Sequence, residues 1–498
     1  MKHFLKLILF FLLIVRPVFA QTISYFEGDI KESSFSKFWS TNDNKEIYSL
    51  SETTSKTTLF KYVDGKVKVT KEYPNKRKSG KVKMKVVNTF FQLKDNIYCL
   101  VQEYSKNKIY SSSIKKVNPT NLNFEEVEIS LSPNKNTVRK FPILTQLISS
   151  PNKEYFGLIN GDFFIQVYDS QMKLVYEVKE ASETNPKNAN FIKGTNLLNS
   201  GKVILEYKSI SRFRESYNFG TAPDYSLYNI RLSVYSKTSH FNIEIKNKTS
   251  LVRDYSIIEN SKGDIGVVGY IGEPVYITKI KALNNLKTLD SKKLMFHLFD
   301  GRTGEEINSN EIGFTGDWEY LRTHKLLYLE DKELFAFVGV EVLEEGKTNP
   351  NENNTGSYAI KQPAYKYGNI QVLFIDNNIK IVAEIKLLHK DKTDPFSNYR
   401  GSTSGLVVTD NGSKVFIASN GSKDASWEEE DLKSKENKYS GVVFHTIYPD
   451  GSIQTLSIKK ELDKDKYVNT ELFYISEEGT IVLSEAYDRS SFIIFQSE

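Results

Sequence analysis

Cysteine is almost absent from this sequence, because Cys99 is the only one in 498 residues. A single thiol cannot form an intramolecular disulfide, so packed apolar surface must stabilise the folded state. Cys99 lies in the short apolar run Ile97–Val101, a pattern typical of a strand. We therefore expect a buried packing thiol rather than a reactive one.

Charge of one sign is also scarce. Lys and Arg total 67, Asp and Glu total 62, and the net charge is +5 with the two signs interspersed. Such a balance provides no general attraction to nucleic acid, and we expect no nucleic-acid partner. One local basic cluster comprises Lys71, Lys76, Arg77, Lys78, Lys81, Lys83 and Lys85. We interpret it as a solvated turn and strand face, with contact to an acidic surface as the alternative.

Long apolar runs are missing, with one exception near the start. Leu7–Val15 is wholly apolar, follows two lysines, and predicts a secretory signal over residues 1–20 with cleavage near Ala20. Its length falls well short of the ~20 residues that a membrane-spanning helix needs. We expect residues 21–498 to be exported to the periplasm, the cell surface or the medium. That part has a net charge of +2 and no predicted transmembrane segment.

Motifs of known catalytic or metal chemistry are likewise absent. The histidines of residues 21–498 show no zinc-ligand spacing, and no complete phosphate-loop, calcium-loop or nucleophile-elbow motif occurs. We expect no metal site and no cofactor. His297 and His445 fall in apolar runs at equivalent places in the repeat described next, which favours a structural role.

What the sequence does contain is a recurring hairpin pattern. A short apolar run meets a turn rich in Asp, Asn, Glu, Lys or Gly, and a second apolar run follows at once. Eight copies occur at intervals of 48 to 81 residues. The second strands are marked by Ile47, Ile97, Tyr155, Val203, Ile265, Leu334, Val415 and Ile481. Because another hairpin follows most copies, one unit is predicted to contain four antiparallel strands.

Four-stranded units in tandem resemble the blades of β-propeller proteins, and the resemblance covers essentially all of residues 21–498. We predict an all-β fold consisting of a single closed propeller of seven or eight blades, with tandem β-sandwich domains as the alternative. The last unit has only three strands, and Thr22–Phe26 is predicted to add the fourth and cover an exposed edge. The repeated dipeptides of WD40 proteins and the double glycines of kelch repeats do not recur.

Long connections between second and third strands occur in four successive units, over residues 209–229, 272–293, 344–367 and 420–439. In a propeller these connections emerge on one face, where insertions often form a binding surface. Aromatic and Arg side chains are the usual anchors of such surfaces. The candidate binding residues are Arg212, Arg214, Tyr217, Tyr225, Glu273, Tyr276, Tyr365, Tyr367 and Trp427.

Together these features predict an exported, monomeric binding or scaffold module rather than an enzyme. Its partner would be a protein or a carbohydrate in the periplasm or at the cell surface. The alternative is a carbohydrate-active enzyme, a glycoside hydrolase or lyase, because cleaving a glycosidic bond requires only a positioned pair of carboxylates. Asp317 and Glu319, which lead into the first strand of the sixth unit, are the candidate carboxylates near the propeller axis.

Overall fold

The computed structural model describes a chain built almost entirely of β-strands. The described residues are 22–26, 35–40, 46–53, 55–63, 66–79, 82–105, 108–131, 146–159, 164–178, 192–208, 229–246, 251–272, 293–314, 321–345, 364–387, 406–421, 441–459, 467–475, 481–486 and 492–496. Within these ranges the only helical element is a 3-10 turn, η2 (Glu330–Lys332). No helix in the described part of the chain has the length and apolarity needed to cross a membrane.

The strands form eight antiparallel sheets, which we call blades 1 to 8. Blade 1 consists of β2 (Phe35–Ser40), β3 (Glu46–Glu52), β4 (Lys56–Val63) and β5 (Lys66–Pro74). Blade 2 consists of β6 (Lys76–Ser79), β7 (Val82–Leu93), β8 (Asn96–Ser105), β9 (Lys108–Val117) and β10 (Phe124–Leu131). Blade 3 consists of β11 (Gln146–Ser149), β12 (Tyr155–Ile159), β13 (Ile165–Asp169) and β14 (Leu174–Val178). Blade 4 consists of β15 (Ile192–Leu197), β16 (Val203–Lys208), β17 (Asn229–Tyr235) and β18 (His240–Lys246).

The later blades repeat the same order. Blade 5 consists of β19 (Leu251–Glu259), β20 (Ile265–Gly272), β21 (Lys293–Phe299) and β22 (Glu306–Gly313). Blade 6 consists of β23 (Leu321–Leu329), β24 (Leu334–Glu345), β25 (Ala364–Ile375) and β26 (Ile381–Leu387). Blade 7 consists of β27 (Leu406–Asp410), β28 (Val415–Gly421), β29 (Gly441–Ile447) and β30 (Ile453–Lys459). Blade 8 consists of β31 (Tyr467–Ile475), β32 (Ile481–Ala486), β33 (Phe492–Gln496) and β1 (Thr22–Phe26).

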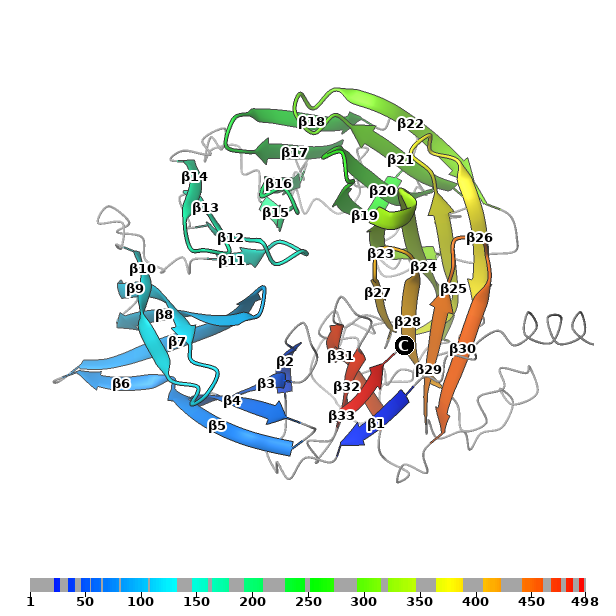
Figure 1. The fold of residues 1–498 in the computed structure, drawn as a ribbon. Coiled ribbons are helices and arrows are strands. Elements are labelled where there is room, and N and C mark those ends of the chain that lie inside the picture. The colour runs from blue at the N-terminus through cyan, green and yellow to red at the C-terminus, as the bar shows by residue number, and fades with distance from the viewer. Residues whose placement is uncertain are drawn as a thin grey trace, which may run out of the picture.

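The blades follow one another around a ring in chain order, as Figure 1 shows. All eight predicted second-strand positions fall in second strands, namely β3, β8, β12, β16, β20, β24, β28 and β32. The predicted repeat is therefore confirmed, with eight units. The first strand of the chain, β1, pairs antiparallel with β33 from Thr22↔Gln496 to Phe26↔Phe492, as predicted. At the same junction β2 of blade 1 contacts β31 of blade 8.

The apolar core lies between neighbouring sheets. Six clusters of buried side chains each combine residues of two successive blades, from blades 1 and 2 through to blades 6 and 7. Cys99 is one of them, completely buried between blades 1 and 2, so the prediction of a packing thiol is confirmed. Face-to-face packing of successive four-stranded sheets is the arrangement of a β-propeller.

Turns between the first and second strands join several successive blades. Lys94 N donates to Lys153 O (3.3 Å) between blades 2 and 3, and Asn152 N donates to the Asn199 side chain (3.0 Å) between blades 3 and 4. Asp331 N donates to Gly412 O (3.0 Å) between blades 6 and 7. These turn-to-turn hydrogen bonds hold successive blades at a fixed spacing along one face of the ring.

Candidate functional site

Most of the residues predicted to bind a partner lie outside the described part of the chain. This applies to Arg212, Arg214, Tyr217, Tyr225, Glu273, Tyr276 and Trp427, and to the alternative carboxylates Asp317 and Glu319. Tyr365 and Tyr367 are described, but the prediction that they belong to a connecting loop is wrong. Both lie in β25, where Tyr365 pairs with Glu344 and Tyr367 pairs with Val342 of β24. The two strands extend beyond their neighbours because they continue to pair with each other past a bulge.

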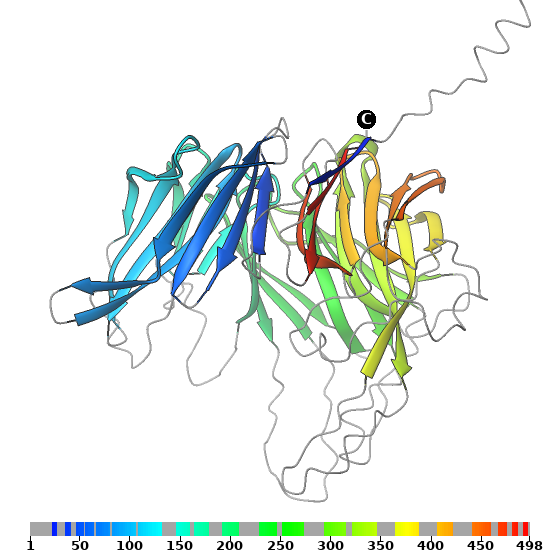
Figure 2. The ribbon, with the colours of Figure 1, turned by 90° about the horizontal axis from the view of Figure 1, so that it is seen from below.

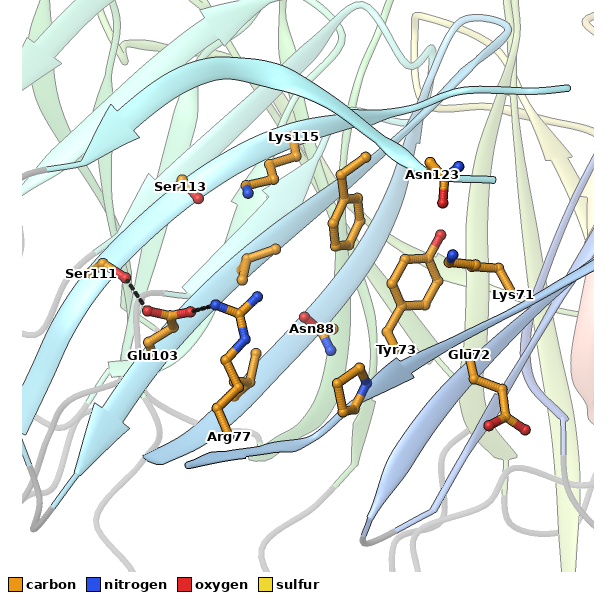
Figure 3. Close-up of a pocket in the computed structure, with 14 residues that line it drawn as sticks. Lys71, Glu72, Tyr73, Arg77, Asn88, Glu103, Ser111, Ser113, Lys115 and Asn123 are labelled. Carbon is orange, nitrogen blue, oxygen red and sulfur yellow. Dashed lines mark hydrogen bonds and ion pairs between the residues drawn. The ribbon is translucent and has the colours of Figure 1, made fainter. Parts of the chain in front are cut away.

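The described residues form a pocket of about 470 Å³ between blades 1 and 2, shown in Figure 3. We call it the inter-blade pocket. It is lined by Lys71, Glu72, Tyr73 and Pro74 of β5, Arg77 of β6, Val86 and Asn88 of β7, Val101 and Glu103 of β8, Ser111, Ser113 and Lys115 of β9, and Asn123 and Phe124. Its volume is within the usual range for a small-ligand site.

Strand register brings the polar side chains of blade 2 into two rows. Asn88, Val101 and Ser113 stand opposite one another across β7, β8 and β9. Val86, Glu103 and Ser111 form the next row. Alternate residues of a strand share a face, so both rows belong to the face that turns toward blade 1.

Asn75 fixes the way blade 1 meets this face. Its backbone N–H donates to Ser55 O (2.8 Å) in blade 1, and its carbonyl accepts from Val86 N (3.0 Å) in blade 2. Its side-chain oxygen accepts from Thr57 Oγ1 (3.1 Å) and from Asn88 Nδ2 (3.3 Å). The pocket wall is therefore held by hydrogen bonds to both sheets.

The apolar part of the pocket is an aromatic cluster. The Tyr73 and Phe124 rings stack with centroids 4.6 Å apart, and Phe90 lies 5.2 Å from Tyr73. The Tyr73 hydroxyl donates to the carbonyl of Leu122. Burial raises the pKa of Tyr73 above its usual value, with a smaller contribution from Cys99, so the hydroxyl stays protonated and remains a donor.

Some charged side chains of the pocket have ion-pair partners among the described residues and others do not. Arg77 forms an ion pair with Glu103, which also accepts from Ser111 Oγ (3.1 Å), and Glu72 pairs with Lys56 (2.5 Å). Both carboxylates therefore already have cationic partners. Within the described residues, neither Lys71 nor Lys115 lies within ion-pair distance of a carboxylate.

Those two ammonium groups are the positive charge that the pocket offers to a ligand. The Lys115 ammonium lies 5.7 Å from the centre of the Phe124 ring. Figure 3 shows Lys71 and Lys115 on opposite sides of Tyr73. The geometry suits an anionic group placed beside a flat apolar surface.

Sequence reasoning missed most of this pocket. It noted Lys71 and Arg77 only as members of the basic cluster, and the structure places both against the pocket. The other lining residues are ordinary strand residues separated by up to about fifty positions. Only the pairing of the blade 2 strands and the packing of β5 against them bring these residues together, so no local signal in the sequence could have found them.

Both strand histidines occupy third strands, β21 and β29, as predicted. His297 Nδ1 lies 2.8 Å from Glu306, and His445 Nδ1 lies 3.0 Å from Thr455 Oγ1. Burial lowers the pKa of His445 to about 4, so its ring is neutral at pH 7. No group of three or more His, Cys, Asp or Glu side chains that could hold a metal ion occurs among the described residues.

These observations define the class of protein: the chain is a β-propeller with a concave polar site between its first two blades. No protein-family model matches it, and no curated protein matches it. Its fold is similar to the C-terminal WD40 domain of Sif2, at TM-score 0.43 and 9% identity over 96% of this chain and 99% of the other.

Two further solved structures share the fold. BamB from Moraxella catarrhalis has a TM-score of 0.39 and 10% identity over 96% of this chain and 100% of its own. The Dos1 propeller has a TM-score of 0.35 and 10% identity, covering 96% and 95%. These scores are low, so the fold assignment rests on the sheet topology given above.

Proposed function

We propose that this chain is an exported β-propeller that binds an acidic carbohydrate, and that the inter-blade pocket holds one acidic sugar unit. The observation that carries the proposal is the pair of ammonium groups, Lys71 and Lys115, which lie beside an aromatic and polar wall and have no carboxylate partner among the described residues. A binding or scaffold role also fits a propeller, whose blades supply a rigid frame for a site.

The chemistry of the wall matches each part of such a ligand. A sugar ring presents apolar C–H groups that can pack on the aromatic surface of Phe124, while its hydroxyls need donors and acceptors such as Ser113 and Asn123. A carboxylate or sulfate on the ring would pair with Lys71 or Lys115. A neutral sugar would leave both ammonium groups without a partner in the pocket.

The test compares a galacturonate trisaccharide with the neutral galactose trisaccharide by isothermal titration calorimetry. We expect the acidic ligand to bind at least tenfold more tightly. The double variant Lys71→Gln/Lys115→Gln should lose about tenfold in affinity for each ammonium removed, because a hydrogen bond to a charged group contributes about 1.5–3 kcal/mol. Lys237→Gln, which removes an exposed lysine of blade 4, is the matched control and should bind as the unmodified protein does.

Equal affinity for the two trisaccharides would contradict the proposal. So would unchanged binding of the acidic trisaccharide by the double variant, provided that its circular dichroism spectrum shows it to be folded.

The long connections of blades 4 to 7 remain a second proposed binding face, for a protein or carbohydrate partner. The observation in its favour is that residues 209–228, 273–292, 346–363 and 422–440 each join a second strand to a third strand. Four insertions at one place in four successive repeats indicate one shared surface.

A further inference from the structure

Blade 2 differs from every other blade in having a fifth strand. The extra strand, β6, pairs antiparallel with the first four residues of β7. The resulting hairpin projects from the body of the molecule in both Figure 1 and Figure 2. Among the described strands β6 pairs with β7 alone, so β6 is an edge strand of blade 2.

The register of this hairpin gathers its lysines on one face. Lys76 stands directly opposite Lys85, and Lys78 stands directly opposite Lys83. Directly opposed residues and residues two apart share a face, so the four lysines occupy one face of the hairpin. We call it the lysine face. Lys76, Lys78 and Lys85 are exposed.

The same register turns Arg77 the other way. Arg77 stands opposite Met84, on the face that meets the inter-blade pocket, where it lines the wall. The hairpin is therefore one wall of the pocket on one side and a basic surface on the other. In the ladder between β7 and β8, Tyr104 pairs with Lys85.

This arrangement works against the stability of the hairpin itself. Like charges directly opposite one another in a sheet repel, and here two such pairs lie side by side. Within the described residues, Lys76 and Lys78 form no ion pair with a carboxylate. An external polyanion would supply Lys76 and Lys78 with the negative charge that no described carboxylate provides.

We propose that the lysine face is a docking surface for the chain of an acidic polysaccharide, one of whose units occupies the inter-blade pocket. The inference rests on the proposed function and extends it from a single acidic sugar to a polymer with repeated negative charges. The polymer would cross the open edge of β6 between the pocket and the lysine face. Lysines two residues apart are about 6.6 Å apart along a strand, which spaces the positive charges regularly along such a polymer.

The composition of the hairpin favours a polysaccharide over other polyanions. A membrane-binding surface would combine its lysines with large apolar residues that enter the bilayer, whereas β6 consists of Lys76, Arg77, Lys78 and Ser79. Single-stranded nucleic acid is usually held by several aromatic side chains on which bases stack. Tyr104 is the only aromatic residue that the ladder places in register with these four lysines.

The experiment measures binding to a polygalacturonate chain and to a galacturonate trisaccharide by the same protein. The double variant Lys76→Thr/Lys78→Thr removes half of the lysine face with residues that favour strands. Its matched control is Lys66→Thr/Lys68→Thr, which removes two exposed lysines at the same spacing on β5. We expect the first variant to lose at least tenfold in affinity for the polymer and to bind the trisaccharide unchanged, while the control binds both normally.

The pocket variant Lys71→Gln/Lys115→Gln separates the two proposals. Loss of trisaccharide binding in that variant supports the pocket, and loss of polymer binding in the hairpin variant supports the lysine face. If the trisaccharide fails to bind while the polymer still depends on Lys76 and Lys78, the pocket proposal falls and the docking surface stands. If the polymer binds the hairpin variant normally, the lysine face proposal falls.

Two further outcomes would overturn the choice of partner or of role. Phosphatidylglycerol vesicles or a DNA duplex that bind as tightly as polygalacturonate, with the same dependence on Lys76 and Lys78, would replace the polysaccharide by that partner. Unchanged polymer binding together with self-association of the hairpin variant would show that these lysines only protect an exposed strand edge. Light scattering measures the self-association, and thermal unfolding verifies that both variants are folded.

Discussion

One glycine allows a buried hydrogen-bond chain to pass between blades 5 and 6. The Tyr270 hydroxyl of β20 donates to Gln371 Oε1 on β25 (2.7 Å), and Gln371 Nε2 donates to Glu384 Oε1 on β26 (2.9 Å). A Cβ atom on Gly339 of β24 would lie only 1.9 Å from that hydroxyl oxygen. Burial raises the pKa of Tyr270 well above its usual value, so the hydroxyl is a permanent donor. The absence of a side chain at residue 339 is thus what permits the link.

We predict that Gly339→Ala destabilises the protein by about 3 kcal/mol, because it overpacks the site and displaces a buried hydrogen bond. Urea unfolding followed by tryptophan fluorescence measures the change. Gly313→Ala is the control, since a Cβ there has no heavy atom within 4 Å and should change the free energy of unfolding by less than about 0.5 kcal/mol. Similar stabilities for the two variants would contradict the prediction.

At the scale of the residue, burial and strand position could be predicted where they depend on neighbours in the sequence. Cys99, in an apolar run, is buried as expected, and His297 and His445 lie in equivalent third strands. The site was not predictable in this way. Lys115 is one lysine among many until the ladder between β9 and β10 places it near Phe124.

At the scale of the element, the repeated hairpins share a backbone rule that the sequence only partly reveals. Every described turn between a first and a second strand, in blades 2 to 7, contains one residue with positive φ. These residues are Lys94, Lys153, Gly201, Gly263, Glu333 and Gly412. Glycine adopts this conformation without cost, whereas other residues do so at some strain. The sequence pattern located these turns through their Gly, Asn and Asp residues. Where glycine is absent from the position, Lys94, Lys153 and Glu333 adopt the same positive φ.

The extra strand shows the limit of pattern reading for elements. Residues 76–78 belong to the basic cluster that the sequence analysis interprets as a solvated turn and strand face. Lys76, Arg77 and Lys78 are exposed, as that interpretation requires, but they pair with β7 as part of a fifth strand. Pairing with a neighbour, rather than burial of an apolar face, makes this segment a strand.

The turns of blades 4 and 5 are linked by a group of side-chain hydrogen bonds. Glu259 at the end of β19 accepts from Ser200 N (2.9 Å), Ser200 Oγ (2.6 Å) and Lys202 Nζ (2.7 Å) of the preceding blade. We predict that Glu259→Ala costs about 3 kcal/mol in the free energy of unfolding, because it leaves the largely buried Lys202 ammonium without its carboxylate partner.

Glu311→Ala provides the comparison for this element. It removes a carboxylate from the exposed pair with Lys293, and such pairs contribute less than about 1 kcal/mol. Chemical unfolding measures both variants under the same conditions. A loss of stability no greater for Glu259→Ala than for Glu311→Ala would show that the turn contacts do not couple the blades.

At the scale of the whole molecule, the architecture was the most predictable property. Eight hairpins, four strands per unit and a last blade completed from the other end of the chain were all readable from apolar runs and turns. The sequence did not predict which apolar side chains of successive blades pack together, and it did not predict the pocket. Both depend on how one sheet faces the next. The long connections could be located by length alone, and β24 and β25 show that part of one such stretch is strand.

The pairing of β1 with β33 predicts a specific response to truncation. A chain that starts at Phe26 or later lacks the outer strand of blade 8 and exposes the edge of β33. We expect a lower unfolding temperature and concentration-dependent self-association, because an open edge pairs with other chains. Differential scanning calorimetry and light scattering measure both effects. A chain that starts at Gln21 is the control and should remain monomeric.

Addition of a synthetic peptide of residues 21–30 should restore the truncated chain by supplying the missing strand. Identical unfolding temperatures for the two chains would show that β1 adds nothing to blade 8.

The same pairing also orders events in time. A ribosome makes β1 long before β33, so β1 must wait for the strands of the intervening blades before it finds its partner. Contacts between such distant segments form slowly during folding. An incomplete chain can build its middle blades but can never finish the blade that contains both ends. Blade 8 is therefore the last blade that this protein can complete, and it can do so only after β33 has been made.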